Sequence, residues 1–139
     1  LSKLITRNNI EPEKLGNEAS IKEEDADENT FDINSEWQKG GYALRKLYHE
    51  SKKPILVIFS SPTCGPCHVL KPQLKRVIKE LQGKVLGIEI DIDKDQEIAK
   101  QAGINGTPTV QLFKDKLLKK QWKGVKQRSE FKEAIENLI

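Results

Sequence analysis

The chain has 139 residues, of which 32% are charged and 6% aromatic, and its formal net charge is +3. This length predicts one domain with a single core, and the lack of any long apolar run excludes a membrane-spanning segment. The first ten residues lack the apolar core and cleavage pattern of a signal peptide. Only two cysteines occur, which excludes a disulfide-rich secreted scaffold and favours a reducing compartment.

The first part of the chain differs in composition from the rest. Apolar residues within residues 1–10 have helical spacing, so we interpret this stretch as the end of a helix from an upstream domain. Because the first residue is leucine and not methionine, we expect further sequence upstream. Residues 11–29 hold eight acidic residues against two lysines and predict a flexible linker. The folded domain is therefore expected over residues 30–139.

Regular elements are predicted from Phe31 onward. Asn34 or Ser35 is a candidate cap for a helix from Glu36 to His49, which a Gly-Gly pair would weaken. The further predicted elements are a buried strand over 54–59, a helix closed by Gly83, a buried strand over 84–92, a helix over 96–101, strands over 109–113 and 117–122, and a last helix capped by Ser129. This order predicts an α/β fold with a central mixed β-sheet and helices on both faces.

The strongest chemical signal is the pair Cys64 and Cys67, placed where a buried strand ends and a helix begins. The helix dipole and free backbone N–H groups favour the thiolate of Cys64. Cys67 lies one turn further on and is less exposed, so it can attack a mixed disulfide on Cys64 from within the molecule. Gly65 and Pro66 set and stiffen the turn between them. We therefore predict that Cys64 is the nucleophile and Cys67 the resolving thiol.

Three other interpretations of the cysteines stay open on the sequence alone. Cys64 to His68 also fits the c-type haem attachment pattern, although the chain has no methionine to serve as an axial ligand. A zinc site would need two more ligands, and only two histidines are available as nitrogen donors. A buried structural pair would leave the Gly-Pro interior unexplained.

Six lysines and an arginine crowd the stretch from residue 114 to residue 128. A nucleic-acid interface would need interleaved aromatic residues or a recognised motif, and neither is present. Lysines on an edge strand, or a rim that steers acidic protein partners, explain the cluster more simply. We expect no nucleic-acid partner and no membrane contact.

A second element of the site is the run Gly106-Thr107-Pro108-Thr109, which precedes a predicted strand. Proline cannot donate to a sheet ladder, so Pro108 belongs at a strand start or a bulge. A cis peptide bond before Pro108 is one expectation, and an ordinary trans proline at a strand start is the other.

The runs Cys64-Gly65-Pro66-Cys67, Gly106-Thr107-Pro108 and Lys123-Gly124-Val125, with Pro72, together resemble the thioredoxin family over residues 31–139. The resemblance implies the thioredoxin fold and the reduction of protein disulfides.

The same resemblance implies roles for residues around the cysteines. Pro108 would be a cis proline beside the active site, Thr107 would offer backbone hydrogen bonds to a bound peptide, and Gly124 would line the same groove. The residues implied to bind substrate are Thr63, Gly65, Pro66, Thr107, Pro108 and Gly124.

Longer phrases are similar to the C-terminal thioredoxin domain of the NADPH-dependent thioredoxin reductase C family of cyanobacteria and chloroplasts. These phrases are residues 41–51, 61–67, 89–92 and 95–99. The similarity implies that electrons pass from NADPH through FAD and a reductase dithiol to the cysteine pair, then to targets such as 2-Cys peroxiredoxin. The reductase domain would belong to the same polypeptide or to a neighbouring subunit.

That resemblance also bears on cofactors and compartment. The chain has no Gly-x-Gly-x-x-Gly motif, so no cofactor is expected in it, and FAD and NADPH would belong to the upstream reductase domain. The compartment implied is the cyanobacterial cytosol or the chloroplast stroma. A free-standing thioredoxin-like protein and a thioredoxin-fold docking module remain as alternatives.

The sequence departs from ordinary thioredoxins around the cysteines. Thr63 replaces a tryptophan, Ser60 replaces another aromatic residue, and Ile58 replaces a buried aspartate that takes the proton of the resolving thiol. Glu89 stands where ordinary thioredoxins have a lysine. Our hypothesis is that burial raises the pKa of Glu89 and that Glu89 is the proton acceptor for Cys67, the alternative being an exposed glutamate on a strand.

Overall fold

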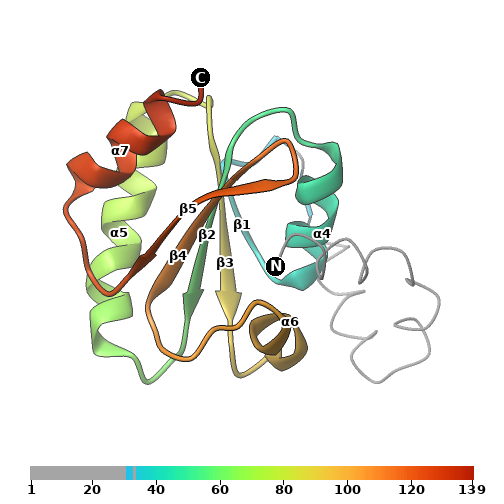
Figure 1. The fold of residues 1–139 in the computed structure, drawn as a ribbon, viewed down its shortest axis with the longest axis vertical. Coiled ribbons are helices and arrows are strands. Elements are labelled where there is room, and N and C mark those ends of the chain that lie inside the picture. The colour runs from blue at the N-terminus through green and yellow to red at the C-terminus, as the bar shows by residue number, and fades with distance from the viewer. Residues whose placement is uncertain (1–30, 33) are drawn as a thin grey trace.

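A five-stranded mixed sheet organises the fold, in the order β1-β3-β2-β4-β5 (Figure 1). The computed structural model describes residues 31–32 and 34–139. The strands are β1 (Trp37–Lys39), β2 (Ile55–Ser60), β3 (Leu86–Asp91), β4 (Thr109–Lys114) and β5 (Leu117–Lys123), and the helices are α4 (Gly41–Glu50), α5 (Gly65–Glu80), α6 (Gln96–Gln101) and α7 (Arg128–Glu136). Strand β3 pairs in parallel with β1 and β2, whereas β4 is antiparallel to both β2 and β5.

Helices cover both faces of the sheet, as the sequence predicts. Helices α5 and α7 lie on one face, and α4 and α6 lie on the other (Figure 1). Strand β2 is buried along its whole length, with Ile58 packed toward α5 and Val57 toward α4. A continuous apolar run is what a central strand needs when both of its faces are covered. The predicted upstream helix and the predicted linker lie outside the described residues.

The predicted helix from Glu36 to His49 is wrong in its first part. Residues 37–39 form the edge strand β1, and the helix begins only at Gly41. Gly40 has φ 98°, a left-handed conformation that glycine tolerates, and its N–H donates to Glu89 O at 3.0 Å. Hydrogen bonds to β3 therefore decide the conformation of this stretch, and Asn34 and Ser35 do not cap a helix.

The cap of the last helix also differs from the prediction. Gln127 caps α7 through a capping box with Glu130, and Ser129 lies inside the first turn.

Among the residues that the structure describes, no helix is both long enough and apolar enough to span a bilayer.

Candidate active site

The two cysteines lie beside the carboxyl-terminal ends of the neighbouring parallel strands β2 and β3. Cys64 is the N-cap residue of α5, and its Sγ accepts a hydrogen bond from the Cys67 N–H at 3.1 Å. The two residues form a disulfide with their Cα atoms 5.3 Å apart. Cys64 is 9% exposed and Cys67 is fully buried. The predicted difference in exposure between the two cysteines is confirmed.

This geometry is suited to thiol–disulfide exchange. When the disulfide is reduced, the free N–H groups of the first turn of α5 face Cys64 Sγ and favour its thiolate. Cys67 is already within bonding reach of that sulfur, so a mixed disulfide formed on Cys64 can be resolved within the molecule. Cys64 can therefore react with an outside disulfide, and Cys67 can release the product.

Hydrogen bonds order the loop between β2 and Cys64. The Cys64 N–H donates to Ser61 O at 3.1 Å, and Ser61 Oγ lies 3.1 Å from Thr63 Oγ1. Ser61 Oγ also donates to Asp93 Oδ2 at 3.2 Å. Ser61 and Asp93 were not predicted as site residues, although each follows one of two neighbouring parallel strands, whose carboxyl ends meet at one edge of the sheet. Thr63 itself is exposed beside Cys64, where a target can reach it.

The second predicted element reaches the same edge of the sheet. Strand β4 pairs with β2 so that Thr109 is opposite Phe59, which places Pro108 beside the end of β2. The Thr107–Pro108 peptide bond is cis, as the first of the two expectations held. The Gly124 N–H donates to Pro108 O at 2.9 Å. The three separate runs Cys64–Cys67, Thr107–Pro108 and Gly124 thus converge on one end of the molecule.

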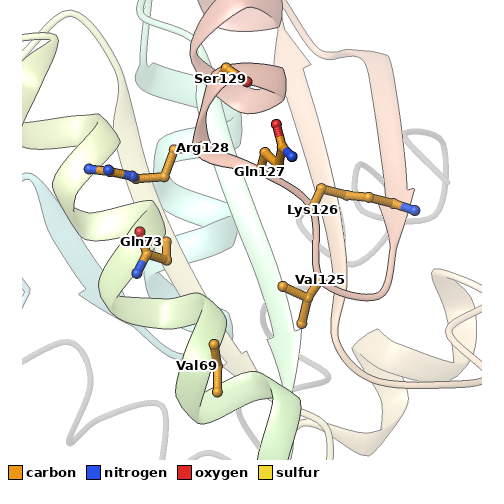
Figure 2. A pocket seen from close by; sticks show the side chains of 7 residues that line it. All are labelled: Val69, Gln73, Val125, Lys126, Gln127, Arg128 and Ser129. Carbon is orange, nitrogen blue, oxygen red and sulfur yellow. The ribbon is translucent and has the colours of Figure 1, made fainter.

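A groove of about 510 Å³ lies between α5 and the start of α7 (Figure 2). Its lining residues are Val69, Gln73, Val125, Lys126, Gln127, Arg128 and Ser129. Val69 is 59% exposed and Val125 is 47% exposed, and Figure 2 shows the two side chains facing each other across the groove. Figure 2 shows the side chains of Lys126 and Arg128 extending in opposite directions, and Arg128 Nη1 lies 3.9 Å from Glu80 Oε2. The lining residues from Val125 to Ser129 directly follow Gly124. Val69 and Gln73 lie on α5, the helix that begins at the two cysteines.

Glu89 is part of a half-buried ion pair. Its Oε2 lies 2.8 Å from Lys71 Nζ, with the two side chains 14% and 19% exposed, and its Oε1 accepts from Trp37 Nε1–H at 3.3 Å. Burial by itself would raise the pKa of Glu89, but the hydrogen bond and charge of Lys71, with Trp37 and Lys39, lower it below its ordinary value of 4.5. The expected rise in the pKa of Glu89 is therefore wrong, because the sequence did not reveal Lys71 as a partner.

The lowered pKa of Glu89 has a consequence for stability. A carboxyl group whose pKa is lower in the folded state than in the unfolded state stabilises the fold at pH values above its pKa in the unfolded state. For Glu89 this contribution is present at neutral pH and is lost as the pH falls below about 4.5.

The metal and haem interpretations gain no support. Over residues 31–32 and 34–139, no three or more His, Cys, Asp or Glu side chains are grouped so that they could hold a metal ion. The two sulfurs are bonded to each other, and the exposed His68 places its Nε2 3.2 Å from Pro62 O.

Comparisons with known proteins agree with this geometry. The sequence profile of the family described as Thioredoxin matches residues 42–137. NADPH-dependent thioredoxin reductase 3 of Arabidopsis thaliana is 56% identical over 106 residues, which cover 76% of this chain and 20% of that protein. Thioredoxin of Rickettsia felis is 35% identical over 97 residues, which cover 70% of this chain and 92% of that protein.

Solved structures give the same result. A mutant thioredoxin from Halobacterium salinarum superposes with a TM-score of 0.65 at 27% identity, covering 73% of this chain and 87% of that one. Chloroplastic thioredoxin z shares the fold with a TM-score of 0.67 at 23% identity, covering 78% of this chain and 96% of that one.

The comparisons confirm the predicted thioredoxin fold and the predicted resemblance to the NADPH-dependent thioredoxin reductases. The chain spans about one fifth of the length of the Arabidopsis reductase and nearly all of the Rickettsia thioredoxin. With its Cys64–Cys67 disulfide at the start of α5, the chain belongs to the thioredoxin family and is a thiol–disulfide oxidoreductase.

Proposed function

We propose that the chain is the disulfide-reducing domain of an NADPH-dependent thioredoxin reductase. Electrons would pass from NADPH and FAD on an upstream reductase domain to the Cys64–Cys67 disulfide, and then to protein targets such as 2-Cys peroxiredoxin. The observation that carries the proposal is the disulfide at the N-terminus of α5, in which Cys64 is 9% exposed and Cys67 is fully buried. The 56% identity to a protein named as such a reductase supports the reductase setting.

The proposal gives each part of the chain a place. Residues 1–10 would end the last helix of the reductase, residues 11–29 would tether the two domains, and residues 30–139 would carry the redox disulfide. The compartment would be the chloroplast stroma or the cyanobacterial cytosol, in line with the Arabidopsis relative. FAD and NADPH would bind only to the upstream domain.

The exchange is a two-electron reaction in two steps. The Cys64 thiolate attacks one sulfur of the target disulfide, so a Cys64–target disulfide forms and the first target thiolate leaves. The Cys67 thiolate then attacks Cys64 Sγ, which restores the Cys64–Cys67 disulfide and releases the second target thiolate. Each released thiolate takes up a proton, and the reductase dithiol supplies the electrons for the next cycle.

Trapping tests the proposed electron path. Cys67→Ser leaves the mixed disulfide on Cys64 unresolved, so the full chain carrying Cys67→Ser should form stable disulfides with a purified NADPH-dependent thioredoxin reductase domain and with oxidised 2-Cys peroxiredoxin. Cys64→Ser is the matched control and should trap neither protein under the same conditions. If neither purified protein is trapped by Cys67→Ser, the reductase setting is wrong, and the free-standing alternative is tested with a separate thioredoxin reductase.

We also propose that Glu89 accepts the Cys67 proton and passes it to solvent. Because the hydrogen bond and charge of Lys71 lower the pKa of Glu89, its carboxylate would act as a relay that does not keep the proton.

The step can be measured alone in the reduced full chain. Excess dithiobis(nitrobenzoate) first forms an adduct on Cys64, and the attack of Cys67 then releases a second nitrothiobenzoate in a first-order phase. Glu89→Gln is expected to slow this second phase by at least about tenfold. Glu133→Gln, on the exposed face of α7, is the control and should leave the phase as it is. An unchanged pH profile in Glu89→Gln would rule out the proton role.

The groove beside α5 is the proposed contact for the chain around a target disulfide. A target segment that places an apolar side chain between Val69 and Val125 would bury the exposed apolar surface of the groove.

Polar substitutions in the groove should therefore weaken protein targets. The double variant Val69→Ser/Val125→Ser is expected to raise the KM for oxidised peroxiredoxin by about fivefold to about fiftyfold, at about 1 kcal/mol for each buried apolar side chain lost. The rate with dithiobis(nitrobenzoate) reports whether the thiol chemistry is intact. Leu117→Ser is the matched control, because Leu117 is 55% exposed at the far edge of the sheet. Equal KM values for the double variant and Leu117→Ser would exclude the groove.

A further inference from the structure

The ion pair between Lys71 and Glu89 lies close to the resolving cysteine. Lys71 follows Cys67 by four residues on α5, a spacing that brings two side chains to the same helix face with their Cβ atoms about 5–6 Å apart. Cys67 is fully buried on that face. Lys71 then reaches across to β3, where its Nζ meets Glu89 Oε2 at 2.8 Å.

The neighbouring strand fixes the position of the pair relative to the core. Glu89 is in register with Ile58 of β2, and Ile58 is fully buried in the same cluster as Leu70 and Leu74 of α5. Paired residues of neighbouring strands share one face of a sheet, so Glu89 also faces α5. Lys71 and Glu89 therefore bridge helix and sheet in the layer that holds Cys67.

The resolving step changes the charge of this layer. When Cys67 loses its proton, a thiolate joins the carboxylate of Glu89, and the ammonium of Lys71 is the positive charge in contact with that carboxylate. Two anions in a partly buried layer are costly unless a cation compensates them. Loss of the Lys71 charge would therefore disfavour ionisation of the Cys67 thiol.

Other charged groups lie around the pair. Lys39 of β1 adds a smaller favourable charge to Glu89, and Lys75, one turn further along α5, lies 5.2 Å from the centre of the Trp37 ring. Asp91 is two residues beyond Glu89, and its Oδ1 accepts from the Asp93 N–H at 2.8 Å. The exposed His68 contacts Pro62 O. The central strands β2 and β4 contribute the uncharged pair Ile58 and Val110.

We propose that Lys71 is a positioning residue for the resolving step, in which its ammonium holds Glu89 in place and compensates the charge of the Cys67 thiolate. The inference rests on the proposed function and adds a residue to it. The proton of Cys67 leaves through Glu89 to solvent, the Cys67 sulfur bonds to Cys64 Sγ, and the target sulfur leaves with the electron pair. Lys71 keeps its own proton throughout.

The test follows the second release of nitrothiobenzoate from the reduced full chain across neutral and alkaline pH. Lys71→Met keeps the length of the side chain and removes the charge. In this variant the midpoint of the pH dependence of the second-phase rate constant should rise by about one pH unit. Near neutral pH the second phase should then be about tenfold slower. Lys71→Arg should restore the midpoint of the unmodified chain. Lys75→Met, a lysine lost one turn further along the same helix, should leave the midpoint in place.

Each other outcome has a distinct meaning. If Lys71→Met lowers the melting temperature but keeps the unmodified pH profile, the pair is only a structural link and the inference is overturned. Lys71→Gln, which can still hydrogen bond to Glu89, serves if Lys71→Met does not fold, and its midpoint should also rise. Glu89→Gln removes an anion and keeps the ammonium, so its midpoint should fall, while the lost proton acceptor keeps its second phase slow. If the unmodified chain releases a single nitrothiobenzoate, Cys67 does not resolve and the proposed function itself fails.

Discussion

Replacing Cys64 with serine is expected to lower insulin reduction by the full chain to the rate of dithiothreitol alone. Cys64 is the N-cap residue of α5 and is 9% exposed, whereas Cys67 is fully buried. A serine hydroxyl is not ionised at neutral pH and cannot form the mixed disulfide. The measurement is the onset and rate of insulin B-chain precipitation at equal protein concentrations.

The thermal stability of Cys64→Ser serves as the control that the variant is folded. The reduced unmodified chain and reduced Cys64→Ser should unfold at similar temperatures, since neither holds the disulfide. Activity of Cys64→Ser above the dithiothreitol blank would show that Cys67 attacks targets directly. Complete inactivity of the unmodified chain would instead favour the docking-module alternative.

The second large effect expected is on stability, for Phe131→Ala. Phe131 of α7 is fully buried, and its ring centre lies 4.8 Å from that of Trp122 in an edge-to-face contact. Removing a buried phenylalanine side chain costs about 3–5 kcal/mol, because the cavity that remains is only partly refilled. We expect the melting temperature of the oxidised chain to fall by about 10 °C or more.

A matched substitution separates burial from loss of an apolar side chain as such. Leu117→Ala removes an apolar side chain that is 55% exposed on β5, and its expected effect is within about 0.5 kcal/mol. Comparable losses of unfolding free energy in Phe131→Ala and Leu117→Ala, measured by urea denaturation, would contradict the burial of Phe131 against Trp122.

Much of the site follows from local sequence. The apolar run of β2 and the helical spacing of α5 place Cys64 at a strand–helix junction, and the Gly-Pro pair after it sets the first turn of the helix. Pro108 belongs at a strand start because it cannot donate to the sheet ladder. These inferences need only neighbouring residues, and the structure agrees with them.

The features that the sequence did not reveal depend on distant parts of the chain. Strand β1 has three residues and owes its conformation to hydrogen bonds with β3, about fifty residues away, such as Gly87 N–H to Glu36 O at 2.8 Å. Gly87 also has no side chain, which leaves room for the Trp37 ring. Spacing within residues 36–49 alone therefore favoured a helix that the sheet overrides.

The expected rise in the pKa of Glu89 is wrong for the same reason. Burial on β3 was correctly expected to disfavour its charged form, but Lys71 lies 18 residues away in sequence and reverses the direction of the pKa. The four-residue spacing of Cys67 and Lys71 on a predicted helix was the available signal that Lys71 lies on the same helix face as the resolving cysteine. Where ordinary thioredoxins have a buried aspartate, this chain has Ile58, and the ion pair beside it supplies the charges of the layer.

The most direct test of the central claim is the order in which the two thiols of the reduced full chain react with iodoacetamide. Limited alkylation near neutral pH, followed by peptide mass spectrometry, assigns the modified cysteine. The geometry at the start of α5 predicts that Cys64 is alkylated first and that Cys67 stays unmodified until Cys64 has reacted. Alkylation of Cys67 first, or of both thiols at equal rates, would contradict the assignment of nucleophile and resolving thiol.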